Sequence, residues 1–222
     1  MKTLFQTLFV FAIASYFVAC SSAPEGEKVD AQDAKENVDT PPAPTTVSLQ
    51  ADAGASLVEW IGTKTAGEHS GTMKLKSGEL QMEGEKLVGG SFVLDMTSIE
   101  VTDLEGKDKT DLEGHLRDND FFEVTKHPEG KFEITEVKEE AGENGQTHVI
   151  GGNLTLKDST KYVELPAAVT YENNVLKATT PQFTIDRTQW GIVYKSSKVG
   201  DMMINDNMGI KIALTTAAPE AH

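Results

Sequence analysis

The chain contains very little cysteine and comparatively little positive charge. Its single cysteine, Cys20, excludes a disulfide within the chain and a metal site built from several thiolates. There are 20 Lys and Arg residues against 35 Asp and Glu residues, a formal net charge of −15 at pH 7. This balance argues against nucleic acid as a partner, because phosphate backbones need a cationic surface. The acidity is typical of a feature that keeps a protein soluble.

Motifs for catalysis and for cofactor binding are also missing. The sequence has no G-x-S-x-G elbow, no H-E-x-x-H pair, no P-loop and no dinucleotide-binding glycine motif. The histidines are scattered, and none has a second histidine or a carboxylate at a spacing typical of a metal site. We therefore expect a protein that is not an enzyme and that holds no metal and no cofactor.

The N-terminus has the pattern of an export signal. The apolar run from Leu4 to Val18 is too short for a stable transmembrane helix and is typical of a secretory signal. The residues around Cys20 (Phe-Val-Ala-Cys-Ser-Ser) resemble the lipobox of bacterial lipoproteins, in which the cysteine is lipidated. We expect residues 1–19 to be a signal peptide. The protein would then be an exported cell-envelope lipoprotein, on the periplasmic side or at the outer membrane, held to the membrane through Cys20.

Composition divides the rest of the chain. Residues 20–46 are rich in Ala, Pro, Glu, Asp and Lys and show no apolar periodicity, which predicts a disordered tether. From Val47 onward apolar and polar residues alternate, and we expect one domain over residues 47–216. The last residues, 217–222, are expected to be a frayed tail.

Most of the domain has the period-2 alternation of β-strands. Lys131–Val137 alternates strictly between polar and apolar residues, and similar short runs recur along the domain between glycine-containing turns. This spacing predicts antiparallel strands in a meander, that is, an all-β barrel or sandwich. A barrel of about eight strands has an interior wide enough for side chains or for one small ligand.

One stretch interrupts the strands. Leu112 and Leu116, four residues apart, would give a short helix an apolar face, and Thr110 with Glu113 fits a capping box at its start. The pair Phe121-Phe122 follows closely. A helix with two adjacent aromatics, inserted among strands, predicts a plug or lid on the β-structure. The alternative is an ordinary connector that buries its leucines.

Five blocks carry a family resemblance. They are Trp60-x-Gly62-x-Lys64 with His69-Ser70-Gly71, Leu87–Ile99, Leu112–Phe122 with His127-Pro128, Gly152–Leu156 with Thr160-Lys161, and Phe183–Ile192. In this order they resemble the YceI-like, lipid- or polyisoprenoid-binding family, and the resemblance spans about Val47–Thr216. The strongly charged loop Val101–Asp108 departs from the family pattern, which argues against a headgroup site on that loop.

The resemblance implies a lipocalin-like antiparallel barrel of about eight strands, with a hydrophobic tunnel and a short helix near its mouth. It also implies that the protein binds an isoprenoid chain, such as a prenyl quinone or prenyl pyrophosphate, or a fatty amide, in the periplasm. The expected tunnel lining is Trp60, Met73, Leu75, Phe92, Leu94, Phe132, Leu154, Phe183, Ile185 and Trp190, with Met96, Ile99, Leu112, Leu116, Phe121 and Phe122 at the mouth. His69, Arg117, Lys161 and Arg187 are candidate groups for a ligand headgroup, although a salt bridge is the favoured role of Arg187.

Three functions are compatible with these patterns. The favoured one is a binding protein that sequesters or carries an isoprenoid or similar amphiphile. The alternative is an envelope-tethered structural or protein-interaction barrel whose interior is filled. The third is a hydrolase or isomerase of a bound lipid with His69 or His115 as base. The sequence does not decide which lipid is bound or whether the protein forms a homodimer.

Overall fold

The structure is a computed structural model that describes residues 23–36, 45–65, 67–196 and 203–218. The predicted signal peptide and Cys20 lie outside the described residues, as do residues 219–222 of the predicted tail.

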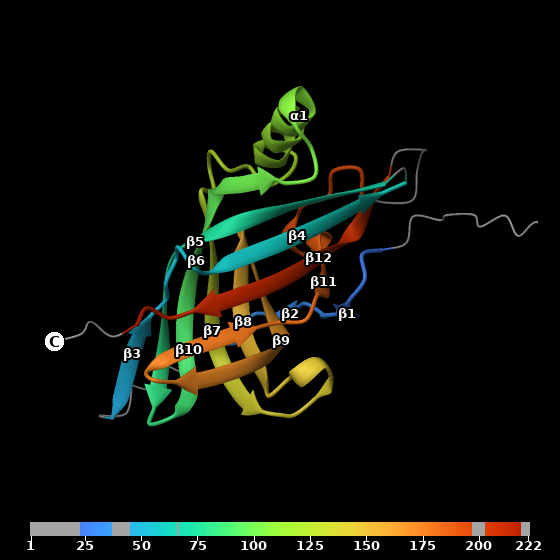
Figure 1. Ribbon diagram of the computed structural model, residues 1–222. Coiled ribbons are helices and arrows are strands. Elements are labelled where there is room, and N and C mark those ends of the chain that lie inside the picture. The colour runs from blue at the N-terminus through green and yellow to red at the C-terminus, as the bar shows by residue number, and fades with distance from the viewer. Residues whose placement is uncertain (1–22, 37–44, 66, 197–202, 219–222) are drawn as a thin grey trace, which may run out of the picture.

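Eight antiparallel strands close a barrel (Figure 1). They are β4 (Leu57–Lys64), β5 (Gly67–Glu83), β6 (Lys86–Val101), β7 (Glu129–Glu139), β8 (His148–Leu156), β9 (Ser159–Glu172), β10 (Val175–Thr179) and β12 (Ile204–Thr215). Strand β12 closes the ring because it pairs with β10 on one edge and with β4 on the other. The predicted all-β barrel is confirmed.

Smaller elements are attached to this barrel. Strand β3 (Thr46–Gln50) pairs with β5. Strand β11 (Phe183–Asp186) pairs with β12, on the same edge of β12 that also pairs with β10. Two short 3-10 turns follow β7 and β11, namely η1 (Glu143–Gly145) and η2 (Arg187–Trp190).

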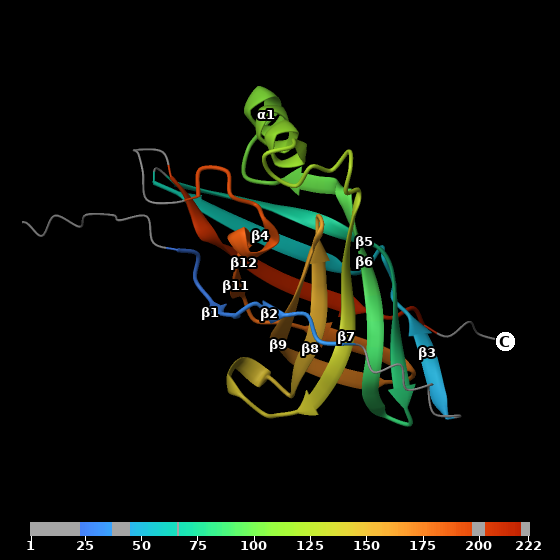
Figure 2. The ribbon, with the colours of Figure 1, turned by 180° about the vertical axis from the view of Figure 1, so that it is seen from behind.

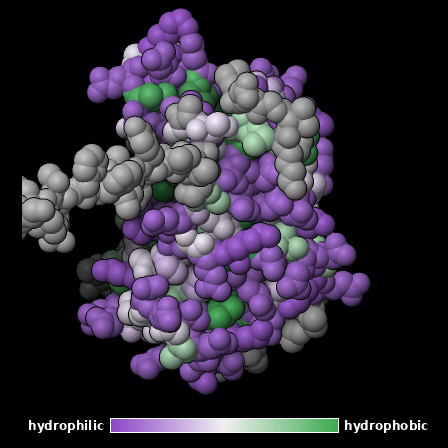
Figure 3. Space-filling model, turned by 90° about the vertical axis from the view of Figure 1, so that its right-hand side faces the viewer, coloured by the Kyte–Doolittle hydropathy of each residue, from purple (hydrophilic) through white to green (hydrophobic). Residues whose placement is uncertain are grey.

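Alternation along the strands sorts side chains between the interior and the solvent. On β9, Val163, Leu165 and Ala167 are buried, whereas Thr170 is exposed on the opposite face. The buried apolar residues fall into two clusters that share partly buried neighbours such as Leu94 and Phe132. In Figure 3 the visible surface is mainly hydrophilic, and a small hydrophobic group lies below the projecting helix.

The helix α1 (Gly106–Arg117) projects at one end of the barrel (Figures 1 and 2). Leu116, Phe121 and Phe122 are buried in the core cluster next to it, as expected for a segment that covers a barrel end. The predicted capping box is wrong, because the helix begins one turn before Thr110. The Thr110 hydroxyl instead donates to the carbonyl of Gly106 inside the helix.

The prediction of a disordered tether over residues 20–46 is wrong for residues 23–36. This segment lies on the outside of the barrel and contains two short strands, β1 (Glu27–Lys28) and β2 (Gln32–Asp33). Composition misled the prediction, since the segment is fixed mainly by backbone hydrogen bonds to unpaired strand edges rather than by burial of an apolar face. We call residues 23–36 the strap.

Arg187 holds together the loop before β12. Its side chain is 1% exposed and donates to the backbone carbonyls of Ile192, Tyr194, Ile204 and Asn205. Burial lowers the pKa of its guanidinium, and the carboxylates of Asp206 and Asp186 oppose this shift. The salt bridge expected from the sequence contributes less than these hydrogen bonds, because the carboxylate of Asp206 is 3.5 Å from Nη2 of Arg187 and its side chain is 40% exposed.

Gly71 is required by close packing between β4 and the end of β6. A Cβ at this position would lie 2.4 Å from Cζ2 of Trp60 and 2.0 Å from the carbonyl oxygen of Glu100. Gly62, on the neighbouring strand, would carry a Cβ with no atom within 4 Å. A side chain is therefore sterically excluded at Gly71, whereas there is room for one at Gly62.

We predict that Gly71→Ala destabilises the protein by about 3 kcal/mol, because the backbone at Glu100 and the ring of Trp60 must both shift. The matched variant Gly62→Ala should change stability by less than about 1 kcal/mol. Urea unfolding of both variants measures the difference. Equal losses would contradict the packing argument.

We predict that Arg187→Lys lowers the free energy of unfolding by about 3 kcal/mol, since one ammonium cannot reach carbonyls on several sides. Asp206→Asn should cost less than about 1 kcal/mol, as for an exposed ion pair. Thermal and urea denaturation distinguish the two, and a larger loss for Asp206→Asn would show that the ion pair dominates.

Candidate functional site

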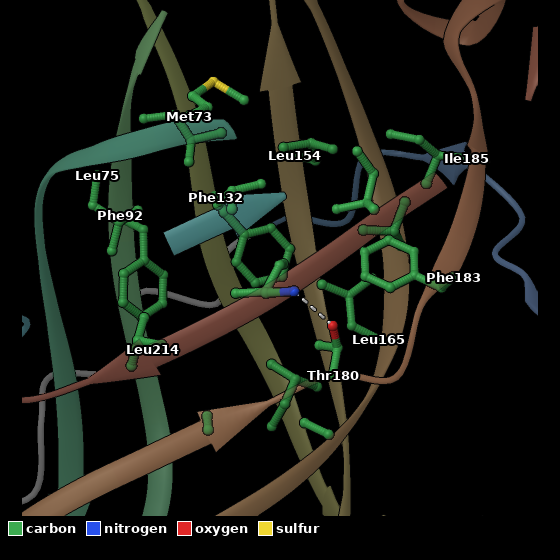
Figure 4. A pocket seen from close by; sticks show the side chains of 18 of the residues that line it. Met73, Leu75, Phe92, Phe132, Leu154, Leu165, Thr180, Phe183, Ile185 and Leu214 are labelled. Carbon is green, nitrogen blue, oxygen red and sulfur yellow. Dashed lines mark hydrogen bonds between the residues drawn. The ribbon is translucent and has the colours of Figure 1, made fainter. Parts of the chain in front are cut away.

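The barrel encloses an apolar cavity of about 160 Å³ (Figure 4). Side chains from every strand of the ring contribute to its wall. The lining residues are Val58, Met73, Leu75, Leu80, Leu87, Phe92, Leu94, Met96, Phe122, Phe132, Ile134, Ile150, Leu154, Leu156, Val163, Leu165, Ala167, Ala178, Thr180, Phe183, Ile185, Met208, Ile210, Ile212 and Leu214.

Thr180 is the one residue with a polar side chain in that wall, and it lies between β10 and β11. Its Oγ1 accepts a hydrogen bond from the backbone N–H of Ile212 at 2.9 Å, as the dashed line in Figure 4 marks. The cavity therefore offers a ligand apolar contacts on all sides, and it suits a hydrocarbon chain better than a polar or charged group.

A second, smaller cavity of about 60 Å³ lies between the barrel and the segment that follows α1. Met73, Phe122, Met208 and Ile210 line both cavities, so the two are adjacent. The smaller cavity is also lined by Trp60, Ile61, Gly62, Ile99, Leu116, Phe121, Arg187, Ile204 and Asn205. Nε1 of Trp60 is buried and has no hydrogen-bond partner, which makes it an uncommitted donor beside this cavity.

The structure divides the predicted tunnel residues into three groups. Those in the wall of the main cavity are Met73, Leu75, Phe92, Leu94, Met96, Phe122, Phe132, Leu154, Phe183 and Ile185. Trp60, Ile99, Leu116 and Phe121 line the smaller cavity instead. Leu112 and Trp190 belong to neither lining, because Leu112 packs against the core from α1 and the indole of Trp190 donates to the carbonyl of Leu154.

Sequence reasoning missed most of the wall supplied by β8, β9 and β12. Val163, Leu165 and Ala167 alternate along β9, and Met208, Ile210, Ile212 and Leu214 alternate along β12. Both runs have the period-2 pattern of inward-facing positions, and this signal could have identified them.

The candidate headgroup residues do not converge on the main cavity. His69 lies near the end of the β4–β5 hairpin, where Nδ1 is 2.8 Å from Oδ2 of Asp103 and Nε2 is 2.8 Å from Nζ of Lys64. Burial raises the pKa of Asp103, but hydrogen bonds from the Ser70 N–H and from His69 outweigh it and leave that pKa lowered. His69 is thus committed to a local polar network.

The other three candidates are also engaged elsewhere. Arg117 donates to the carbonyl of Ile99, and Lys161 pairs with Asp33 of the strap at 3.2 Å on the outside of the barrel. Arg187 does line the smaller cavity, but its hydrogen bonds hold the loop before β12. The four candidates thus do not come together at one place, and a role for any of them toward a ligand headgroup stays a prediction.

His115, the other histidine considered as a base, lies on α1. Its ring packs edge-on against Tyr194 at 4.5 Å and against Phe121 at 5.8 Å, and its Nδ1 is 3.7 Å from Oδ1 of Asp120. Neither His115 nor Asp120 is among the residues that line the two cavities.

Within the described ranges, no group of three or more His, Cys, Asp or Glu residues could hold a metal ion. The helices that the structure describes are too short or too polar to span a bilayer.

Curated relatives match a limited part of the chain. A UPF0312 protein of Photorhabdus laumondii is 49% identical over 53 residues, which are 24% of this chain and 26% of the relative. A UPF0312 protein of Serratia proteamaculans is 43% identical over 60 residues, or 27% of this chain and 29% of the relative. The chain thus aligns with less than a third of the length of either relative.

Two solved structures share the fold. BcnA of Burkholderia cenocepacia superposes with a TM-score of 0.59 at 17% identity, over 75% of this chain and 99% of that one. A polyisoprenoid binding domain from Saccharophagus degradans, implicated in plant cell wall breakdown, gives a TM-score of 0.54 at 14% identity, over 79% and 99%. At these identities the likeness shows the fold alone.

The family model for the YceI-like domain matches residues 49–216, from the edge strand β3 to the end of β12. The matched range contains the closed barrel, the helix at its end and both apolar cavities. This chain therefore belongs to the YceI-like domain family.

Proposed function

We propose that this protein binds an isoprenoid or a similar amphiphilic lipid in the barrel and sequesters or carries it. The observation that supports the proposal most directly is the wall of the main cavity, which is apolar on every strand of the ring. Burying apolar groups contributes about 0.8 kcal/mol per CH₂, and micromolar binding needs about 8 kcal/mol in all. Roughly ten buried carbon atoms would therefore supply the affinity before association costs.

The size of the cavity sets how much of a ligand fits without movement. A cavity of about 150 Å³ lined by Leu, Ile and Phe is large enough to bind benzene, and the main cavity here is of similar size at about 160 Å³. One isoprene unit, with five carbon atoms, is comparable to benzene. A longer chain needs the wall to move, or needs to continue into the adjacent cavity beneath Phe122.

The smaller cavity suggests where the polar end of such a ligand would lie. Its wall contains Trp60, whose buried Nε1–H lacks a partner, and it lies toward the helix end of the barrel. In our proposal the chain occupies the main cavity and an oxygen of the ligand accepts from Trp60. The polyisoprenoid binding domain of Saccharophagus degradans, with the same fold, supports an isoprenoid as the first ligand class to test.

We further propose that the protein is exported and anchored in the cell envelope by a lipid on Cys20. The proposal is supported by the apolar run before Cys20 and by the small residues around it. A lipid ligand and a membrane anchor are consistent, because the anchor keeps the barrel next to the source of its ligand.

The first experiment is native mass spectrometry of a chain that begins at Ser21 and so lacks the anchor, purified without detergent from a bacterial host, followed by organic extraction. We expect a co-purifying species of isoprenoid or acyl mass. Ala167→Phe places a phenyl ring in a cavity of about benzene size and should weaken menaquinone-4 binding roughly tenfold or more.

The matched control is Thr170→Phe, which adds the same ring to the solvent face of the same strand and should leave binding unchanged. A protein that is isolated empty and refuses added quinones and prenyl lipids would contradict the proposal. The alternative, a filled barrel for interaction with another protein, would then be preferred.

The anchor is tested separately by growing expressing cells with radiolabelled palmitate. We expect label on the wild-type protein and none on Cys20→Ser, which should also move from the membrane fraction to the soluble fraction after cell breakage. Label that persists in Cys20→Ser, or an unlabelled wild-type protein, would contradict lipidation at this residue.

A further inference from the structure

The barrel wall has a seam that its own strands do not close. Beyond the segment paired with β10, the outer edge of β9 has no barrel strand beside it, and the outer edge of β11 is likewise left over after β11 pairs with β12. The strap bridges these two edges. Glu27 and Lys28 pair in parallel with Phe183 and Thr184 of β11, and Gln32 and Asp33 pair antiparallel with Tyr162 and Lys161 of β9.

The strap is held at its far end by an outward-facing amide. Oδ1 of Asn153 accepts from the Lys35 N–H at 3.0 Å, and Nδ2 of Asn153 donates to the Lys35 carbonyl at 2.7 Å. The ammonium of Lys35 lies 3.6 Å above the ring of Tyr162 and 3.2 Å from Glu136. Asn153 and Tyr162, which face outward from β8 and β9, are 5% and 0% exposed, so the barrel surface is built to receive this segment.

The seam borders the main cavity. Val163 on one side of the seam and Phe183 and Ile185 on the other all line the main cavity, and Val29 of the strap is buried in the same core cluster. In Figure 4 the blue strap passes beside Ile185, at the edge of the cavity. The strap thus forms the outer layer of the cavity wall at this point.

The attachment of the strap is weak compared with that of a barrel strand. Each of its strands contributes two paired residues, and Pro24 and Val29 are its only buried side chains among residues 23–36. Its ion pairs are exposed, and such pairs contribute little. When the strap leaves, the amide of Asn153 exchanges the backbone of Lys35 for water, and the hydroxyl of Tyr162 keeps its partners Glu136 and Glu164. Segments of this kind open at a fraction of the global unfolding free energy.

We propose that the strap is a gate, which detaches to open the seam between β9 and β11 and lets a lipid chain pass between the membrane and the cavity. This inference depends on the proposed lipid-binding function. Two further observations support it. The cavity of about 160 Å³ must expand to take a chain longer than about one isoprene unit. Glu27, the first strap residue that pairs at the seam, comes seven residues after Cys20, so an anchored strap holds the seam within roughly 25 Å of the membrane surface.

The gate is tested with a reversible lock. Asp33→Cys combined with Lys161→Cys places two thiols at directly paired positions of the strap and β9, at a spacing that a disulfide can bridge, and so holds the strap to that edge of the seam. In a chain that begins at Ser21 these are the only cysteines. The matched control is Thr155→Cys with Thr160→Cys, a disulfide within the β8–β9 hairpin that does not cross the seam.

Menaquinone-4 in phosphatidylcholine vesicles serves as the probe, and its uptake is followed by quenching of the two tryptophans, Trp60 and Trp190. We expect oxidation to slow uptake at least tenfold in the seam pair and less than twofold in the control pair, with dithiothreitol restoring the rate. If the reduced protein does not bind menaquinone-4, the proposed function fails. If it binds at a rate that the lock does not change, the gate fails, and the helix end becomes the route.

A second measurement needs no ligand. In hydrogen exchange, the amide of Val29, which donates to the Thr184 carbonyl at 2.8 Å, should exchange at least a hundredfold faster than amides of the β8–β9 ladder. Asn153→Ala should speed exchange at Val29 further and leave the β8–β9 ladder unchanged. Exchange at Val29 as slow as in the ladder would show that the strap is an integral strand and would overturn the gate.

Discussion

The structure depends on the way in which β12 closes the barrel. One edge of β12 pairs with β4, and its other edge is divided between β11, opposite Asn207–Ile210, and β10, opposite Ala213–Thr215. Because β10 and β11 share that edge, the chain must cross from one to the other at Thr180–Gln182. Strand β9 pairs with β10 but not with β11. The seam between β9 and β11 is a geometric consequence of this division, and the strap is the element that covers it.

The interior follows from the same closure. Eight strands surround a space that side chains can almost fill, and the inward positions are nearly all aliphatic or aromatic. Small residues such as Ala167 and Ala178 in that wall leave part of the space unfilled. An apolar cavity left open sacrifices packing contacts. We interpret the unfilled space as the part of the barrel given over to ligand in a YceI-like protein.

The two ends of the binding region differ in chemistry. The main cavity contains one hydroxyl, that of Thr180, and this oxygen already accepts a backbone hydrogen bond. Near α1, two polar groups in the wall of the smaller cavity differ in their hydrogen bonding. The guanidinium of Arg187 donates to several backbone carbonyls, whereas Nε1 of Trp60 has no hydrogen-bond partner. The charged group at this end, Arg187, thus stabilises a loop, whereas the donor without a partner, the indole N–H of Trp60, is neutral. This arrangement fits a neutral oxygen of a ligand better than a phosphate.

The sequence alone determined the strands of the barrel and part of the cavity wall. Period-2 alternation in stretches such as Lys131–Val137 is a local property, because successive side chains of a strand face opposite sides wherever the strand lies. For the same reason Met73, Phe92 and Phe183 could be placed in the interior before the fold was known. Only the tertiary structure decided which polar groups meet. Asn153 meets Lys35 across 118 residues, and Arg187 meets the carbonyls of Asn205 and Ile204 across 18 and 17 residues, and no local pattern encodes such partners. The strap shows the limit most clearly: its composition is that of a disordered tether, and its order comes from strand edges that exist only once the barrel has closed.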